Sequence, residues 1–142
     1  MKLDEIFCLK NRHRFYLAGH ALVIIVVILF FKFIPERKWA ALCAGTLFLT
    51  GPLFVLITEF KVQLLFKSFS TYGALFFLGL SAIPIFFLRI TNWDQAFESL
   101  SLFGFSGPEL HHISNYLFYF MLMTFVADSM LANYKRKQKI DI

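Results

Sequence analysis

The strongest constraint on this chain is a set of four long apolar segments that are separated only by short polar connections. We place them at residues 15–34, 39–58, 69–88 and 110–131. A helix rises about 1.5 Å per residue, so about 20 apolar residues are enough to cross the roughly 30 Å hydrocarbon core of a bilayer. A helix also satisfies its backbone hydrogen bonds internally, whereas four short strands cannot close a barrel. The sequence therefore predicts an all-α integral membrane protein with a single four-helix transmembrane domain over residues 1–142.

The composition agrees with membrane insertion. Apolar residues make up 58% of the chain, charged residues make up 16%, and 20 residues are phenylalanine. Soluble domains are nearer to about half apolar and about a quarter charged. The net charge of +5 would favour nucleic acid as a partner of a soluble protein. In a membrane protein the positions of the basic residues set the orientation instead, so we expect the lipid bilayer, and not nucleic acid, as a partner.

Lysine and arginine are distributed unevenly between the two sides of the predicted bundle. Ten of the 14 lie before the first segment, in the second connection or in the basic tail at 132–142, and four lie in the first and third connections. Cytoplasmic segments of membrane proteins carry the excess of Lys and Arg. We therefore expect both termini in the cytoplasm and the outer loop, residues 89–109, on the opposite side. The expected location is the cytoplasmic membrane of a bacterium, which the chain crosses several times.

The second connection is predicted to be amphipathic. In "EFKVQLLFKSF" (residues 59–69), charged residues alternate with bulky apolar ones. A lysine can lay its alkyl stem along an apolar surface while its ammonium group stays in water. Lys61 and Lys67 are therefore expected to anchor this segment at the inner membrane surface.

The outer loop is expected to contain a short amphipathic helix. Within "NWDQAFESLSLFGFSG" (residues 92–107), four bulky apolar residues are spaced by four, three and three positions: Trp93, Phe97, Leu100 and Phe103. This spacing is typical of one face of a helix. Tryptophan is enriched at membrane interfaces, so Trp39 and Trp93 are predicted interface anchors.

Proline interrupts the second and third segments, at Pro52 in "TGP" and at Pro84 in "SAIP". Proline removes an amide donor and clashes with the preceding turn, so both helices are expected to kink. Neither proline has charged or amide neighbours of the kind that frame an ion site in transporters. We interpret both as packing kinks.

The fourth segment opens with a polar stretch, "PELHHISNYLFY" (residues 108–119). The overlapping "SGPE" (residues 106–109) matches a capping box with proline in the first turn, so the helix is predicted to start just before the histidines. The candidate polar cluster comprises Glu109, His111, His112, Asn115, Tyr116 and Tyr119. At about 100° per residue, four of these share one face of the helix: His112, Asn115, Tyr116 and Tyr119. His111 points elsewhere.

Away from this stretch, two ionisable residues fall inside the apolar segments, His20 and Asp128. An ionisable group inside a membrane helix is a candidate for function. Both lie within about two turns of the predicted cytoplasmic edge, where Asp128 is expected to reach interfacial water. No metal site is predicted, because His112 and Glu109 lie one turn apart without a third strong ligand.

The stretch "LFGFSGPELHHISNYL" is similar to the start of the last helix in the small cytochrome b561-type four-helix proteins, which also follows a Phe-Gly-Pro loop and begins with histidine. This resemblance implies haem held by histidines on facing helices. The second histidine that such a helix carries one membrane depth later is missing, since Phe125 and Val126 occupy those positions. His20 is predicted near the opposite membrane face from His111 and His112. We therefore predict no resident cofactor, with haem as the alternative.

The sequence contains no CxxC motif, phosphate-binding loop, nucleophile elbow or HExxH motif, and no catalytic residue is predicted. We expect a small polytopic membrane protein that acts as a non-catalytic subunit or assembly component of a larger membrane complex. Its partners would be other membrane protein subunits or copies of itself. The alternative is a membrane redox or transport component that uses His111 and His112 at the outer face.

Overall fold

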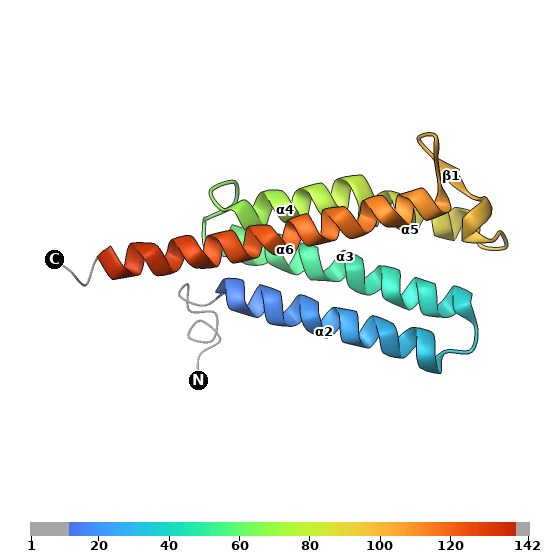
Figure 1. Cartoon of the computed structure of the whole chain (residues 1–142), viewed down its shortest axis with the longest axis horizontal. Coiled ribbons are helices and arrows are strands. Elements are labelled where there is room, and N and C mark those ends of the chain that lie inside the picture. Colours follow the sequence, from blue (N-terminus) through green and yellow to red (C-terminus); the bar gives the residue numbers. More distant parts are fainter. Residues whose placement is uncertain (1–11, 139–142) are drawn as a thin grey trace.

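The computed structural model describes residues 12–138, and its main feature is four long helical rods that alternate in direction (Figure 1). The rods are α2 (Arg12–Phe33), α3 (Arg37–Lys61), the continuous run α4 (Phe69–Phe77), η1 (Leu78–Ala82) and α5 (Ile83–Thr91), and α6 (Gly107–Gln138). All four are long and apolar enough to cross a membrane. The predicted number of helices and their order are therefore confirmed, and α6 extends beyond the predicted 110–131 at both ends.

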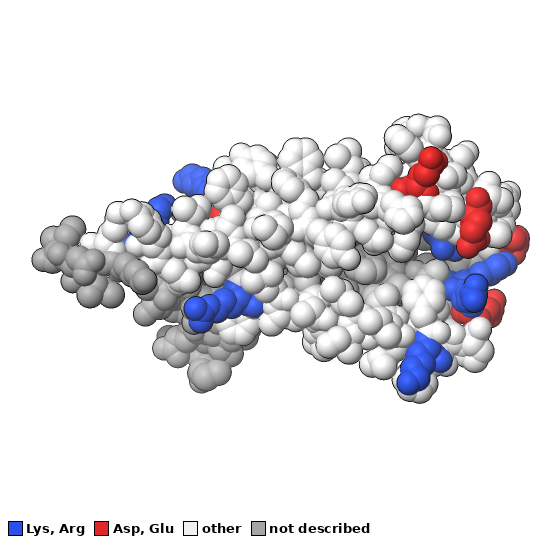
Figure 2. All heavy atoms as spheres, viewed as in Figure 1, with Lys and Arg blue, Asp and Glu red and all other residues white. Residues whose placement is uncertain are grey.

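The surface of the bundle is apolar along its length. Leu22, Ile25 and Ile28 of α2 are all more than half exposed. On the face seen in Figure 2, the charged side chains gather toward the two ends and leave an uncharged band between them. Such a surface is costly in water and suits a lipid environment. Composition and surface together indicate a multi-pass membrane protein.

The helices enclose a narrow core. Around the bundle, α2 packs on α3, α3 on α4, α4 on α6, and α6 on α2, with α4 and α6 forming the most extensive contact. The core residues come from all four rods and include four aromatic side chains: Tyr16, Phe77, Phe118 and Phe125, packed with Val55, Ala74, Leu78, Ala82 and Met121. We call the end where α2 starts and α6 finishes the N/C end, and the opposite end, where α5 leads into a small hairpin, the hairpin end (Figure 1).

The proline in the third rod is accommodated by a change of helix type. Residues Leu78–Ala82 form one π-helical turn, in which the Ile83 amide donates to the carbonyl of Leu78. Proline has no amide to donate and its ring crowds the carbonyl four residues earlier. After the wider π turn, Pro84 lies in the first turn of α5, where its missing amide donor is harmless. Pro52, by contrast, lies inside α3 without ending it.

The third connection does not form the predicted amphipathic helix. It contains a short 3-10 turn, η2 (Phe97–Ser99), followed by the antiparallel strands β1 (Ser101–Leu102) and β2 (Phe105–Ser106). The two-residue turn between the strands has positive φ at both Phe103 (55°) and Gly104 (84°). This geometry is that of a type I′ turn, which reverses the chain where a helix was expected. Leu100 is buried and Phe103 is 83% exposed, so the four apolar residues share no face.

The second connection is shorter than predicted, because α3 continues to Lys61 and only residues 62–68 join it to α4. Lys61 and Lys67 are exposed at the N/C end. Glu59, predicted to lie on the membrane surface, is instead completely buried inside the bundle. That part of the prediction is wrong, because Glu59 has partners on another helix that make its burial possible.

Substitution of Gly73 tests the close contact between α4 and α6. A Cβ at this position would collide with Oγ1 of Thr124 and lie 3.1 Å from the Cα of Met121. Overpacking of this kind costs about 1–3 kcal/mol, so Gly73→Ala is expected to lower the thermal unfolding midpoint in detergent. The matched control is Gly19→Ala, where a Cβ meets nothing within 4 Å. Equal midpoints for the two variants would contradict the contact.

Candidate functional site: a polar cluster and a cavity

Buried polar side chains gather at the N/C end of the bundle and connect all four rods. We call this group the N/C-end polar cluster; it consists of Arg12, His13, Tyr16, Glu59, Ser70 and Asp128. Each of these residues is buried. Burying charged groups is costly unless they are paired and hydrogen-bonded. Their mutual contacts therefore decide whether the bundle can close at this end.

The first half of the cluster is centred on Glu59 of α3. Its Oε1 accepts a hydrogen bond from Nε of Arg12 at 2.8 Å and another from the hydroxyl of Tyr16 at 2.9 Å. Arg12 and Tyr16 lie one turn apart on α2, so both reach the same carboxylate. The second oxygen, Oε2, is buried without a hydrogen-bond partner in the described part of the chain. The two hydrogen bonds to Glu59 join the start of α2 to the last turns of α3.

The second half is centred on Asp128 of α6. Its carboxylate accepts from the backbone amides of Phe69 (3.2 Å) and Ser70 (2.7 Å) and from the Ser70 hydroxyl (2.6 Å). These amides belong to the first turn of α4. The N–H groups of a first turn have no acceptor within the helix and carry positive partial charge. Because the Ser70 hydroxyl donates to Asp128, its oxygen accepts from Nδ1 of His13 at 3.2 Å. A chain of hydrogen bonds therefore runs from α2 through α4 to α6.

His20 lies deeper in the bundle, one turn beyond Tyr16. Its Nδ1 donates to the carbonyl of Tyr16 at 2.7 Å, since a carbonyl only accepts, and its ring packs 5.2 Å from that of Phe125. The other nitrogen, Nε2, faces Gly51 and has no hydrogen-bond partner among the described residues. The absence of a side chain at Gly51 lets α3 approach the imidazole.

The structure corrects the expected setting of Asp128. We expected this carboxylate to reach interfacial water, but it is buried on the α4 terminus. Met121, Thr124 and Asp128 are all buried on the side of α6 that packs on the other helices. Its role as a helix cap was detectable only with knowledge of which helices pack together, although Ser68, the side-chain cap of α4, is a recognisable helix-start residue.

Sequence reasoning missed most of this cluster. Arg12 and His13 precede the predicted first helix, and Glu59 follows the predicted second one. They therefore lie outside the apolar segments and were not recognised as residues of the bundle interior. Tyr16 resembles an ordinary interfacial tyrosine. The available signal was helical spacing, since His13, Tyr16 and His20 follow one another at three and four residues and so share a face.

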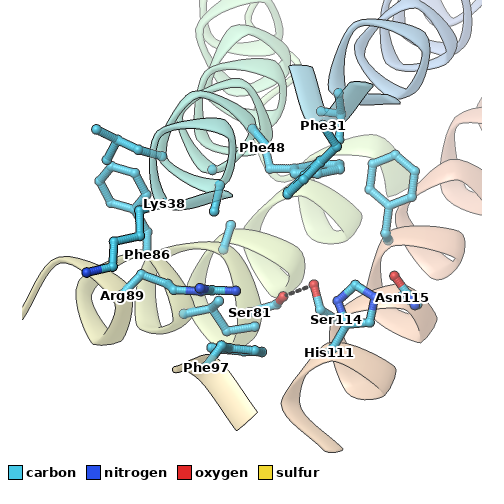
Figure 3. A pocket seen from close by; sticks show the side chains of 18 of the residues that line it. Phe31, Lys38, Phe48, Ser81, Phe86, Arg89, Phe97, His111, Ser114 and Asn115 are labelled. Carbon is cyan, nitrogen blue, oxygen red and sulfur yellow. Dashed lines mark hydrogen bonds between the residues drawn. The ribbon is translucent and has the colours of Figure 1, made fainter. Parts of the chain in front are cut away.

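A second candidate site is a cavity of about 390 Å³ at the hairpin end, lined by all four rods and the third connection. Figure 3 shows its walls, where Ser81 donates a hydrogen bond to Ser114 at 2.7 Å. Its inner part is formed by three aromatic rings, of Phe48, Phe77 and Phe118, with the Phe118 ring 5.5 Å from each of the other two. We call this space the hairpin-end cavity. Its volume is within the roughly 300–1,000 Å³ that is typical of small-molecule sites.

Polar side chains lie toward the hairpin end of this cavity. Lys38, Arg89, His111 and Asn115 are among the residues that line it. The Arg89 guanidinium lies over the ring of Phe97, with its carbon 4.0 Å from the ring centroid (Figure 3). Trp93 also lines the cavity and packs edge-on against Trp39, 5.4 Å between ring centroids. The two predicted interface anchors therefore meet at this end.

The predicted polar cluster of α6 is divided by the structure. His111, Asn115 and Tyr119 line the cavity. His112 and Tyr116 do not, and Tyr116 is 73% exposed. Glu109 closes the helix start, where its Oε2 accepts from the backbone amide (2.8 Å) and hydroxyl (2.7 Å) of Ser106. The six residues therefore form no single site, and the predicted helix start at the "SGPE" motif agrees with α6 beginning at Gly107.

Neither site gathers ligands for a metal or a haem. Among the described residues, no group of three or more His, Cys, Asp and Glu side chains is placed to hold a metal ion. The His20 ring lies beside Phe125, which follows His111 by 14 residues on α6. That separation is about 21 Å at about 1.5 Å per residue, so His20 and His111 of one chain cannot ligate the same iron.

Comparison with protein-family models, curated proteins and solved structures finds no match to this chain. The functional argument therefore rests on the geometry of the two sites.

The contact between Asp128 and α4 is tested by a double-mutant cycle with Ser70. Asp128→Ala leaves buried amides without an acceptor and is expected to lower the free energy of unfolding by about 2 kcal/mol or more. Ser70→Ala removes part of the same network, so the two effects should be non-additive by about 0.5–3 kcal/mol. The measurement is reversible unfolding in mixed micelles.

The matched control for this cycle is Asp94→Ala. Asp94 is highly exposed, and its one ion-pair partner within residues 12–138 is Lys38, at 3.2 Å, so its loss should cost less than about 1 kcal/mol. Additive effects of the Asp128 and Ser70 substitutions, or an Asp128 effect as small as that of Asp94, would contradict the proposed cap.

Proposed function

We propose that this chain is a non-catalytic membrane protein that binds a small amphipathic molecule in the hairpin-end cavity and acts as an accessory component of a larger membrane assembly. The observation that carries the proposal is the cavity itself, which has an aromatic interior and polar side chains toward one end. A molecule that is apolar at one end and polar at the other matches this arrangement. The N/C-end polar cluster would hold the helices together at the opposite end.

An accessory role is supported by the exposed face of α6. His112, Tyr116 and Tyr119 are exposed in the first turns of this helix. Hydrogen-bonding side chains on a membrane helix are used at contacts between helices as well as at the headgroups. We therefore place the contact with a second subunit, or with another copy of this chain, on this face.

The orientation proposed for this protein has both termini in the cytoplasm, in the cytoplasmic membrane of a bacterium. Support comes from the excess of lysine and arginine before the first segment, in the second connection and in the tail. The hairpin-end cavity would then lie in the outer half of the bilayer, beside the acidic third connection.

A redox or transport role is the second candidate. The observation in its favour is that His111 lines the cavity, so an imidazole would contact whatever occupies it. His112 lies outside the cavity and would not take part. A visible haem absorption band in the purified protein would favour this candidate over the first one.

The cavity function is tested by filling the cavity. Native mass spectrometry of the protein purified in mild detergent should show a co-purified amphiphile on the wild type. Ser114→Phe, which places a ring in the cavity wall, should lose that mass. Ile25→Phe, on the exposed face of α2, should retain it. The same spectra measure assembly, and a bare monomer without ligand or partner would contradict both parts of the proposal.

The orientation is tested at the tip of the hairpin. Phe103 is 83% exposed, so a Phe103→Cys variant in a background without native cysteines should react readily with a membrane-impermeant maleimide on intact cells. Gln63→Cys, in the second connection, is the matched position at the other end and should react only after the cells are opened. The reverse labelling pattern would overturn the proposed orientation.

A further inference from the structure

The hairpin-end cavity has an unbalanced charge. The cations Lys38 and Arg89 line it, whereas no aspartate or glutamate of the described part of the chain does so. The acidic residues nearby lie outside: Asp94 pairs with Lys38 from an exposed position, and Glu98 acts on Arg89 electrostatically from an exposed one. The cavity wall therefore carries positive charge, and these carboxylates leave the space inside the cavity free for an anionic ligand.

Arg89 differs from Lys38 in having no ion-pair partner in the described part of the chain. It lies on α5 with its guanidinium stacked on Phe97, an arrangement that fixes the plane of the group. A guanidinium in this position offers a planar set of donors that matches a carboxylate or a phosphate. Partial removal from water makes such a pairing more favourable than it would be at an exposed arginine.

The opposite end of the cavity requires an apolar occupant. Phe77 precedes Arg89 by 12 residues along the third rod, which is about 18 Å at about 1.5 Å per residue. The rings of Phe48, Phe77 and Phe118 close this end, so a charged group there would lose its hydration without a partner. A volume of about 390 Å³ is near the lower limit for small-molecule sites. It suits one hydrocarbon chain or ring system.

We propose that the occupant is a single-chain amphipathic anion, with its carboxylate or phosphate on Arg89 and Lys38 and its hydrocarbon part against the three phenylalanine rings. This inference rests on the proposed function, because it names the class of molecule that the cavity holds. Arg89 is then the residue that selects for negative charge. The apolar end supplies affinity without selecting a particular head group.

Intrinsic fluorescence reports directly on this cavity. The chain has two tryptophans; Trp93 lines the cavity and Trp39 packs against Trp93. The experiment titrates the full chain, in nanodiscs of neutral lipid, with dodecyl phosphate, dodecanoate, dodecanol, dodecyltrimethylammonium and inorganic phosphate. We expect saturable fluorescence changes with both anionic amphiphiles, at affinities at least tenfold higher than with the alcohol or the cation. Inorganic phosphate alone should give no change at the same concentrations.

Three variants assign the charge selection to one residue. Arg89→Gln should weaken binding of dodecyl phosphate at least tenfold while leaving dodecanol unchanged, and Arg89→Lys should recover part of the loss because it keeps the charge. Arg37→Gln is the matched control, because Arg37 is exposed at the same end and does not line the cavity. The thermal midpoint of each variant establishes whether it is folded, and the ligand series on the wild type decides the question independently of the variants.

The outcomes separate this inference from the proposed function. Equal affinities for the alcohol and the anions would overturn the inference and leave the cavity as a ligand site. Saturable binding of inorganic phosphate alone would also overturn it, because the apolar end would then be unused. No saturable change with any amphiphile would overturn both the inference and the proposed function.

Discussion

The carboxylate of Asp128 on the first turn of α4 is the contact on which the arrangement of the bundle depends. A helix start leaves amides that need acceptors, and a low-dielectric interior makes an unmet requirement costly. Asp128 meets it from α6 and so fixes how α4 and α6 lie beside each other. Toward the hairpin end, Gly73 then meets Thr124, Phe77 meets Phe118, and Ser81 meets Ser114. One polar contact thus determines a ladder of apolar and polar pairs along the most extensive helix contact.

The two ends of the bundle are built differently. At the N/C end, ion pairs and hydrogen bonds connect every rod, so the helices are held by directional contacts. At the hairpin end, they are joined by side-chain packing, the Ser81–Ser114 bond and the exposed Lys38–Asp94 pair, and they leave a cavity. A firmly held end allows the other end to remain partly open without loss of the fold. The proposed ligand site accordingly lies where the helices are held least tightly.

The sequence was sufficient for the four helices because apolar length is a local property. It was also sufficient for the start of α6, where the residues of the capping motif are neighbours in the chain. It was insufficient for Glu59, whose burial depends on Arg12 and Tyr16 of another helix. The third connection was predicted as a helix from the spacing of four residues, Trp93, Phe97, Leu100 and Phe103, but the chain reverses in a turn at Phe103 and Gly104. The cavity could not be predicted, because it depends on which faces of four helices meet.

The π-helical turn at Leu78–Ala82 determines which side chains of the third rod can point the same way. In an unbroken α-helix, residues 12 positions apart, such as Phe77 and Arg89, differ by about 120° around the axis at about 100° per residue. A π turn absorbs roughly one extra residue, so this difference falls to about 20°. Phe77 and Arg89 therefore line the same cavity from its two ends. If this turn became α-helical with all its residues kept, the difference would return to about 120° and the guanidinium would rotate away from the cavity, whereas removing one residue together with the π turn would leave it in place.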